Sequence, residues 1–206
     1  AIISPFTYGH KDNKAVVKMH RTYVKYTSQF VSGVTSPSNY TLSTSLINNN
    51  FKNAVVKKCI FNSVQIDNDR LSEIIEIKKQ RNSDFFKFFF AGRLVEIKGI
   101  VHLIESFNQL DMENTELHIC GGGALLDYVK KESEKNSRII VHGKLDNEQL
   151  GKVYDECDVA VVPSMWPEPF GRVVIEANMH ALPVIVSDCG GMPEIISNTK
   201  AGTVYK

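Results

Sequence analysis

The chain has 206 residues, 43% of them hydrophobic and 23% charged, and its 24 basic and 23 acidic residues leave a formal net charge of +1. This length and composition are those of a globular protein with one domain, or with one domain and a large appended piece, and they exclude a disordered tail. A nearly neutral chain offers no bulk attraction to polyanions, so we expect no nucleic-acid partner.

The sequence also disfavours membrane and metal chemistry. No apolar run approaches the roughly 18 residues that cross a membrane, and the amino end lacks the pattern of a secretory signal. The cysteines form no C-x-x-C pair and the histidines no H-E-x-x-H motif, so we expect reduced thiols and no metal site. We therefore expect a cytoplasmic protein, with peripheral attachment to the inner face of the membrane left open for the full-length protein.

Residues 1–83 carry a mixed signal. Residues 27–48 contain ten serines or threonines, yet 30–35 has the pattern of a strand and 38–48 that of a helix. Residues 54–61 predict another strand. The mixed charges of residues 67–84 indicate a solvated connection or a helix.

From residue 85 onward, short β-branched or aromatic runs alternate with longer segments of helical periodicity. Helices are expected in the gaps between strands, among them one with an apolar stripe that includes Ile97, Ile100 and Ile104, and one capped by Asp146. The predicted strands are residues 86–91, 116–120, 138–141, 158–162, 183–187 and 203–205. This alternation predicts an α/β fold with a Rossmann-like, doubly wound parallel sheet.

The first candidate site follows the strand that ends at Ala91. Gly92 and Arg93 come directly after it, and Lys98 stands five residues beyond Arg93. Ligands of open α/β sheets bind beyond the carboxyl ends of the strands. The planar fork of an arginine and the point charge of a lysine suit a diphosphate, although two solvated loop cations are the alternative.

A second candidate is the glycine turn after the next predicted strand. Gly121 and Gly123 could let backbone N–H groups approach an anion. A nicotinamide-binding fingerprint would need a small residue where Leu126 stands and an acidic residue where Lys144 follows the next strand. The sequence therefore disfavours a nicotinamide-binding domain.

The most informative stretch places two glutamates around a predicted helix start. Glu168 lies in a proline-bounded loop, Gly171 opens the helix, and Glu176 follows Glu168 after seven intervening residues. Amides at that helix start would lie beside a carboxylate that can accept hydrogen bonds from sugar hydroxyls. The alternative is a loop charge and a solvated helix face, but Glu176 stands between Ile175 and Ala177, where a carboxylate needs a partner.

Together these motifs resemble the donor-binding domain of GT-B fold, retaining, family-4-type glycosyltransferases (glycosyl transferases group 1). The resemblance covers residues 86–205 and includes G-R-L-x-x-x-K-G at 92–99, G-x-G at 121–123, E-x7-E at 168–176 and G-G-M-P-E at 190–194. It implies that the chain is one half of a GT-B fold. Residues 1–51 would be a remnant of the acceptor domain, and residues 52–206 the nucleotide-sugar domain, with 85–206 as its main unit.

The resemblance implies a role for each matching residue. Arg93 and Lys98 would hold the donor diphosphate, and Glu168 the transferred sugar; these three are the catalytic candidates. Glu176 would bind the ribose and Lys144 the base. The remaining donor-binding candidates are Gly92, Gly121, Gly123, Phe170, Gly171 and Arg172.

The chain also departs from the family pattern. Phe61 and Ser63 stand where proline and glycine are usual in the strand and turn expected to open the donor domain, and Ala181 replaces a usual glycine. The acceptor domain is incomplete, so we expect a fragment of a longer protein that is inactive alone.

The function implied is transfer of a sugar from a UDP- or GDP-linked donor to a glycan or lipid-linked acceptor, with retention and without a metal or a cofactor. The acceptor domain of the same protein would be its partner. Two alternatives remain: a nucleotide-binding module without catalysis, and a GT-B fold nucleotide-sugar epimerase, against which the E-x7-E spacing argues.

Overall fold

The computed structural model describes residues 14–47, 49–64 and 67–206. The chain divides into two compact units, Ala1–Asn62 and Ser63–Lys206. Each unit is described separately below.

The described part of the first unit contains a β-α-β motif. Its elements are α1 (Lys14–Thr27), a 3-10 helix η1 (Ser28–Phe30), β1 (Gly33–Ser36), α2 (Asn39–Ile47) and β2 (Val56–Cys59). β1 and β2 pair in parallel, from Gly33 opposite Val56 to Ser36 opposite Cys59. Ser38 caps α2, because its Oγ accepts a hydrogen bond from the Thr41 N–H at 3.1 Å.

Three expectations for this unit need adjustment. The strand expected at 30–35 begins only at Gly33, since Ser28–Phe30 forms a 3-10 helix. The strand expected at 54–61 is limited to Val56–Cys59. The pairing of that strand with β1 places it in the first unit, so the division falls after Asn62 rather than at the expected 51/52. Residue 48, the last of the helix expected at 38–48, lies outside the described residues.

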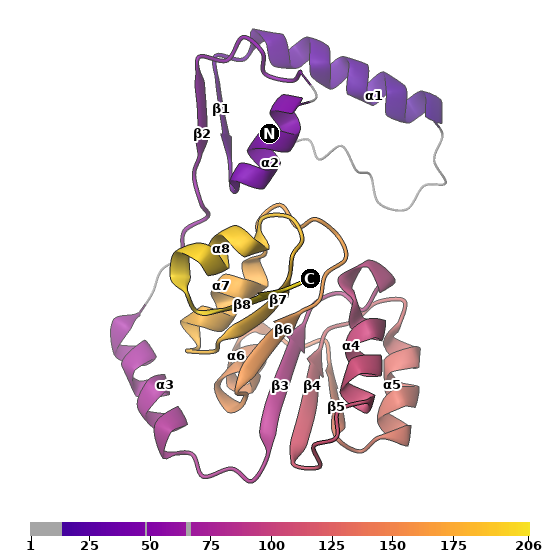
Figure 1. Cartoon of the computed structure of the whole chain (residues 1–206), viewed down its shortest axis with the longest axis vertical. Helices are drawn as coiled ribbons and strands as arrows, with labels where there is room; N and C mark the ends of the chain where they lie inside the picture. Colours follow the sequence, from indigo (N-terminus) through magenta and orange to yellow (C-terminus); the bar gives the residue numbers. More distant parts are fainter. Residues whose placement is uncertain (1–13, 48, 65–66) are drawn as a thin grey trace. The chain divides into compact units, whose positions relative to one another are not determined.

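The second unit is a parallel sheet of six strands in the order β5-β4-β3-β6-β7-β8 (Figure 1). The strands are β3 (Phe86–Ala91), β4 (Thr115–Cys120), β5 (Ile139–Gly143), β6 (Val159–Val162), β7 (Val184–Ser187) and β8 (Gly202–Tyr205). The helices are α3 (Asn68–Gln80), η2 (Glu96–Lys98), α4 (Ile100–Asn108), α5 (Leu126–Lys135), α6 (Asn147–Glu156), α7 (Arg172–Met179) and α8 (Met192–Thr199). The predicted doubly wound α/β fold is confirmed.

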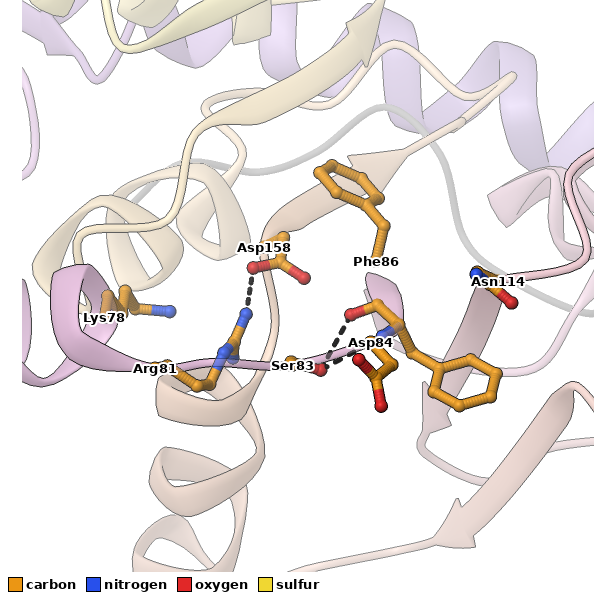
Figure 2. A pocket seen from close by; sticks show the side chains of 8 residues that line it. Lys78, Arg81, Ser83, Asp84, Phe86, Asn114 and Asp158 are labelled. Carbon is orange, nitrogen blue, oxygen red and sulfur yellow. Dashed lines mark hydrogen bonds and ion pairs between the residues drawn. The ribbon is translucent and has the colours of Figure 1, made fainter.

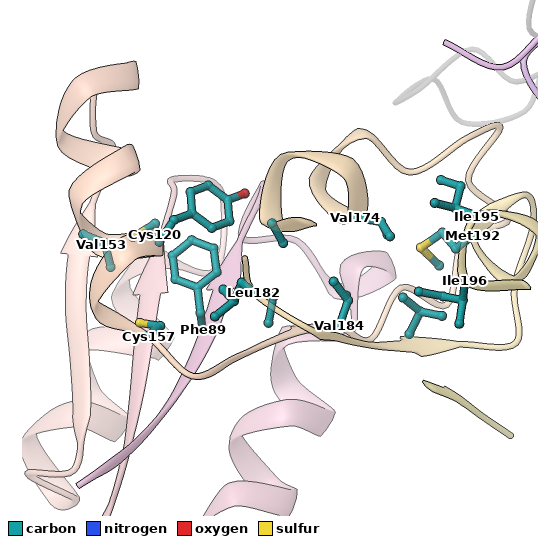
Figure 3. Close-up of a cluster of buried hydrophobic side chains, with 14 of the residues drawn as sticks. Phe89, Cys120, Val153, Cys157, Val174, Leu182, Val184, Met192, Ile195 and Ile196 are labelled. Atoms are coloured by element: carbon teal, nitrogen blue, oxygen red, sulfur yellow. The ribbon is translucent and has the colours of Figure 1, made fainter. Parts of the chain in front are cut away.

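Two hydrophobic clusters lie against the sheet and show why these segments fold as they do. Adjacent phenylalanines of β3 enter different clusters, because successive strand side chains point to opposite faces. Phe90 packs with residues of α4 and α5 such as Ile104 and Val129. Phe89 packs with Leu182 and with residues of α6, α7 and α8 (Figure 3). Helices therefore cover both faces of the sheet.

α3 is fixed to the amino-terminal edge of the sheet by polar contacts (Figure 2). Lys78 Nζ donates to the carbonyls of Tyr154 and Cys157, at 3.1 Å and 2.6 Å. Arg81 forms an ion pair with Asp158, whose other oxygen accepts the Lys87 N–H at 2.7 Å. Burial, and then the charge of Arg81, lower the pKa of Lys78. Lys78 and Arg81 also line a pocket at this edge. Both cations are thus already bound to other groups of the second unit.

The order of the strands locates the candidate site. Strand order reverses at β3, with β4 and β5 on one side and β6, β7 and β8 on the other. At such a switch point the loops after the two neighbouring strands diverge and leave a crevice at their carboxyl ends. The loops after β3 and β6 are the ones that carry Lys98 and Glu168. Among the residues described, no helix is long and apolar enough to cross a membrane.

Candidate functional site

The loops that follow β3 and β4 interlock through their backbones. The N–H of Gly92 donates to Cys120 at 3.0 Å, and that of Leu94 donates to Gly122 at 2.9 Å. Gly121 has φ +140°, and a Cβ built on it would lie 1.9 Å from the carbonyl oxygen of Gly92. Only glycine fits there. The two glycine motifs, G-R-L and G-G-G, thus form one packed structure at the carboxyl edge of the sheet.

The loops that follow β3 and β6 meet at Lys98 and Glu168. Lys98 ends η2, and its Nζ forms an ion pair with Glu168 Oε1; their side chains are 21% and 17% exposed. The backbone supports this contact, since the carbonyl of Ile97 accepts the N–H groups of Met165 at 2.9 Å and Trp166 at 3.2 Å. The structure therefore joins two predicted site residues that lie 70 positions apart in the sequence.

Ser164 completes this pair and was missed by the sequence analysis. Its side chain is buried, and its Oγ lies 3.2 Å from Glu168 Oε1. The available signal was a small polar residue two positions after the end of the apolar strand β6 and four residues before Glu168. A hydroxyl at the end of a buried strand needs a hydrogen-bond partner, and a nearby loop carboxylate is a suitable one.

The loop after Glu168 leads into α7, as expected. α7 begins at Arg172, with Gly171 as its N-cap residue. The side chain of Phe170 is buried in the cluster that contains Phe89 and Leu182, so its main chain is the part that can reach a ligand. The first N–H groups of a helix lack intrahelical acceptors and favour negatively charged partners.

Glu176 has an ion-pair partner on its own helix. Arg172 Nη2 lies 3.2 Å from Glu176 Oε1, and the side chains are 81% and 34% exposed. The partner expected for this carboxylate is therefore Arg172, on the same helix. Glu176 also affects a buried side chain: burial, and then the charge of Glu176, raise the pKa of Tyr154. In the part of the chain that is described, the buried Tyr154 hydroxyl has no hydrogen-bond partner.

The two remaining cations lie on exposed positions. Arg93 follows Gly92 with an exposed side chain, on the loop that carries Lys98. Lys144 is also exposed and follows β5, from which β6 is separated by β4 and β3. Lys144 thus lies at the edge of the sheet, well removed in strand order from the loop of Glu168.

The next question is whether side chains of the described residues could bind a metal ion or act as reactive thiols. Over residues 14–47, 49–64 and 67–206, no group of three or more histidine, cysteine, aspartate or glutamate side chains is arranged to hold a metal ion. Burial raises the pKa values of Cys120 and Cys157 to about 12, which keeps both as unreactive thiols at neutral pH.

Solved structures share this fold. A structure of Anabaena Alr3699/HepE with UDP aligns with 100% of this chain and 56% of its own, at a TM-score of 0.71 and 24% identity. Sucrose-phosphate synthase from Thermosynechococcus elongatus aligns with 96% of this chain and 51% of its own, at a TM-score of 0.72 and 22% identity. At these identities the likeness concerns the fold.

Sequence comparison gives the family. An uncharacterized glycosyltransferase of Methanocaldococcus jannaschii is 37% identical over 117 residues, 55% of this chain and 30% of that protein. An uncharacterized 41.2 kDa protein in the cps region of Klebsiella pneumoniae is 30% identical over 149 residues, 70% of this chain and 40% of that protein. This chain thus spans less than half the length of either relative. The model of the family "Glycosyl transferases group 1" matches residues 72–206, and the chain belongs to that family of glycosyltransferases.

Proposed function

We propose that residues 63–206 bind the nucleotide-sugar donor of a retaining glycosyltransferase. The observation that carries this proposal is the meeting of Lys98 and Glu168 at the point where the strand order reverses. A cation and a carboxylate held side by side offer one partner for a diphosphate and one for sugar hydroxyls. The family to which the chain belongs supports the assignment.

The proposed chemistry is stabilisation of the leaving diphosphate. As the bond between sugar and diphosphate breaks, negative charge grows on the diphosphate oxygens. Arg93, Lys98 and the first amides of α7 would stabilise this charge without a metal ion, while Glu168 orients the sugar. Positively charged and hydrogen-bonding groups that are already in place contribute more than mobile ones, and the backbone contacts of Ile97 hold the loop of Lys98 in place before the donor binds.

Glu176 and Lys144 would hold the nucleoside. Glu176 accepts hydrogen bonds from the ribose hydroxyls in this proposal, in exchange for its contact with Arg172. Lys144 would lie near the base. UDP is the first nucleotide to test, because Alr3699/HepE was solved with UDP, and GDP is the second.

The remaining parts of the proposal concern the full-length protein. The first unit, Ala1–Asn62, would belong to its acceptor domain, and the acceptor would be a glycan or a lipid-linked sugar. The present chain should bind the donor without transferring its sugar, because half of the cleft that orients the acceptor and excludes water would be missing.

The experiment is a calorimetric titration of the chain with UDP, GDP and their sugar conjugates, with and without EDTA. Arg93→Ala and Lys98→Ala should each lower diphosphate affinity about tenfold or more, because a hydrogen bond to a charged group contributes about 1.5 to 3 kcal/mol. Lys79→Ala is the matched control, since Lys79 is an exposed lysine whose ion-pair partner is Glu76 on α3. Equal losses for all three variants, or binding that vanishes in EDTA, would contradict the proposed site.

The two alternatives are separated by turnover in the full-length protein. A binding module would hold the donor without consuming it, whereas an epimerase would release nucleotide without any acceptor. Acceptor-dependent release of nucleoside diphosphate is the outcome expected of a transferase.

A further inference from the structure

Ser164 is a buried hydroxyl, 1% exposed, that contacts the carboxylate of the proposed donor site. Three acceptors surround its Oγ: Glu168 Oε1 at 3.2 Å, the carbonyl of Trp166 at 3.2 Å and the carbonyl of Ile97 at 3.4 Å. A hydroxyl has one proton to donate. The carboxylate carries a full charge and forms the stronger hydrogen bond, so the Ser164 hydroxyl is best oriented to donate to Glu168 Oε1.

The same carboxylate oxygen also accepts from Lys98 Nζ. Glu168 Oε1 is therefore held by two donors, one charged and one neutral. A diphosphate that binds Lys98 would compete for the charged donor only. The hydroxyl of Ser164 would remain as the contact that keeps the carboxylate in place.

The backbone around this hydroxyl is fixed from three sides. The carbonyl of Ser164 accepts the hydroxyl proton of Ser187, at the end of β7, at 2.6 Å. The carbonyl of Glu168 accepts the N–H of Gly191 at 2.7 Å, and that of Ile97 accepts Met165. Ser164 and Glu168 thus belong to a loop that is tied to η2, β7 and the turn before α8, which gives the hydroxyl a defined position.

We propose that Ser164 is a positioning residue that makes the site prefer a nucleotide sugar over the free nucleoside diphosphate. This proposal rests on the proposed function. When a free diphosphate takes Lys98, Glu168 loses its cation and stays beside a ligand of like charge, which weakens binding. When the ligand carries a sugar, its hydroxyls donate to Glu168 and replace the lost contact. The discrimination requires that the carboxylate stay in place, which is the role of Ser164.

The consequence is a site that holds the donor more firmly than the nucleotide product. Release of the product restores the contact between Lys98 and Glu168 and returns the site to its ligand-free state. The carboxylate therefore acts on both ligands, and Ser164 acts through it without touching the substrate.

The test measures a ratio, the dissociation constant of UDP divided by that of UDP-glucose, by calorimetry on the whole chain. GDP and GDP-mannose replace them if the wild type selects guanine. Glu168→Gln should lower this ratio about tenfold or more, because it removes a charged acceptor. Ser164→Ala should lower it several-fold while the affinity for UDP is unchanged or rises. The double variant should show no larger effect than Glu168→Gln alone.

Ser187→Ala is the matched control. It removes a hydrogen bond from the same network without touching Glu168, so it should lower the melting temperature and leave the ratio unchanged. Ser164→Cys leaves no cavity, since its side chain is slightly larger, has a weaker donor, and serves if Ser164→Ala does not fold. An unchanged ratio in the foldable Ser164 variants would overturn the proposal. So would an equal effect of Ser164→Ala in the presence and absence of Glu168→Gln. A wild type that binds none of these ligands would instead overturn the proposed function, and this proposal with it.

Discussion

Gly99→Ala tests whether the Lys98 contact depends on close packing of the loops behind it. Gly99 lies between η2 and α4 with φ +73°, and a Cβ at this position would lie 1.9 Å from the carbonyl oxygen of Pro163. The carbonyl oxygen belongs to the backbone and the position of the Cβ is fixed by it, so no side-chain rotation can relieve the clash. Alanine must therefore push apart the loops that carry Lys98 and Glu168.

The expected cost has two parts. A non-glycine residue in the left-handed region costs about 1 to 2 kcal/mol, and overpacking costs about 1 to 3 kcal/mol, so we expect a loss of about 2 to 5 kcal/mol in the free energy of unfolding. Gly143→Ala isolates the first part, because Gly143 has φ +71° and no atom within 4 Å of a built Cβ. It should cost about 1 to 2 kcal/mol.

Equilibrium unfolding in urea measures both costs, and titration with UDP reports the effect on the site. Gly99→Ala should be the less stable variant and should bind UDP more weakly than Gly143→Ala, since Lys98 directly precedes the displaced residue. If Gly99→Ala is as stable as Gly143→Ala, the loops after β3 and β6 are not packed as described, and the reasoning on the Lys98 contact fails.

Three further predictions concern stability. Asp146→Ala should lower the free energy of unfolding by about 1 kcal/mol, measured in urea, because Asp146 and Gln149 form a reciprocal capping box at the start of α6; no change would mean that the cap is not formed. Leu182→Ala should cost about 2 to 5 kcal/mol in the same assay, since Leu182 is buried in the larger cluster, and a cost below about 1 kcal/mol would contradict that packing. Burial, and then the charge of His118, lower the pKa of His142. The unfolded chain therefore binds a proton at this histidine more readily than the folded one. The contribution of His142 to the free energy of unfolding is intact above the ordinary pKa range of histidine and is lost as the pH drops through that range. The melting temperature should accordingly fall more between about pH 7.5 and about pH 5 in the wild type than in His142→Gln, and equal falls would remove His142 from the acid response.

The fold of the second unit could be predicted from the sequence because its signal is local. Residues 86–91 were predicted as a strand with the bounds that β3 has, since a run of phenylalanines next to a polar turn is typical of a strand buried on both faces. Asp146 likewise predicted the start of α6, because aspartate is a preferred N-cap residue. The first unit was less predictable: the strand expected at 30–35 begins only at Gly33, because Phe30 belongs to the 3-10 helix Ser28–Phe30.

The contacts of the site were only partly predictable. The pairing of Arg172 with Glu176 follows from helix spacing and could have been found, since residues four apart lie on one helix face. The pairing of Lys98 with Glu168 could not, because it depends on the strand order and on the conformation of Gly99. Motifs thus identified the residues, whereas tertiary packing decided their partners.

The short ladder between β3 and β6 gives the sheet a seam. Only two residue pairs are in register there, Phe88 with Val159 and Phe89 with Ala160, whereas six join β3 to β4. Local opening of a native protein begins where the fewest contacts must break, and the Lys98 contact with Glu168 bridges this seam at its carboxyl end. A ligand held from both sides would therefore act as a clamp, slowing amide hydrogen exchange in β3 and β6 and making the rigidity of the sheet depend on the ligand's concentration.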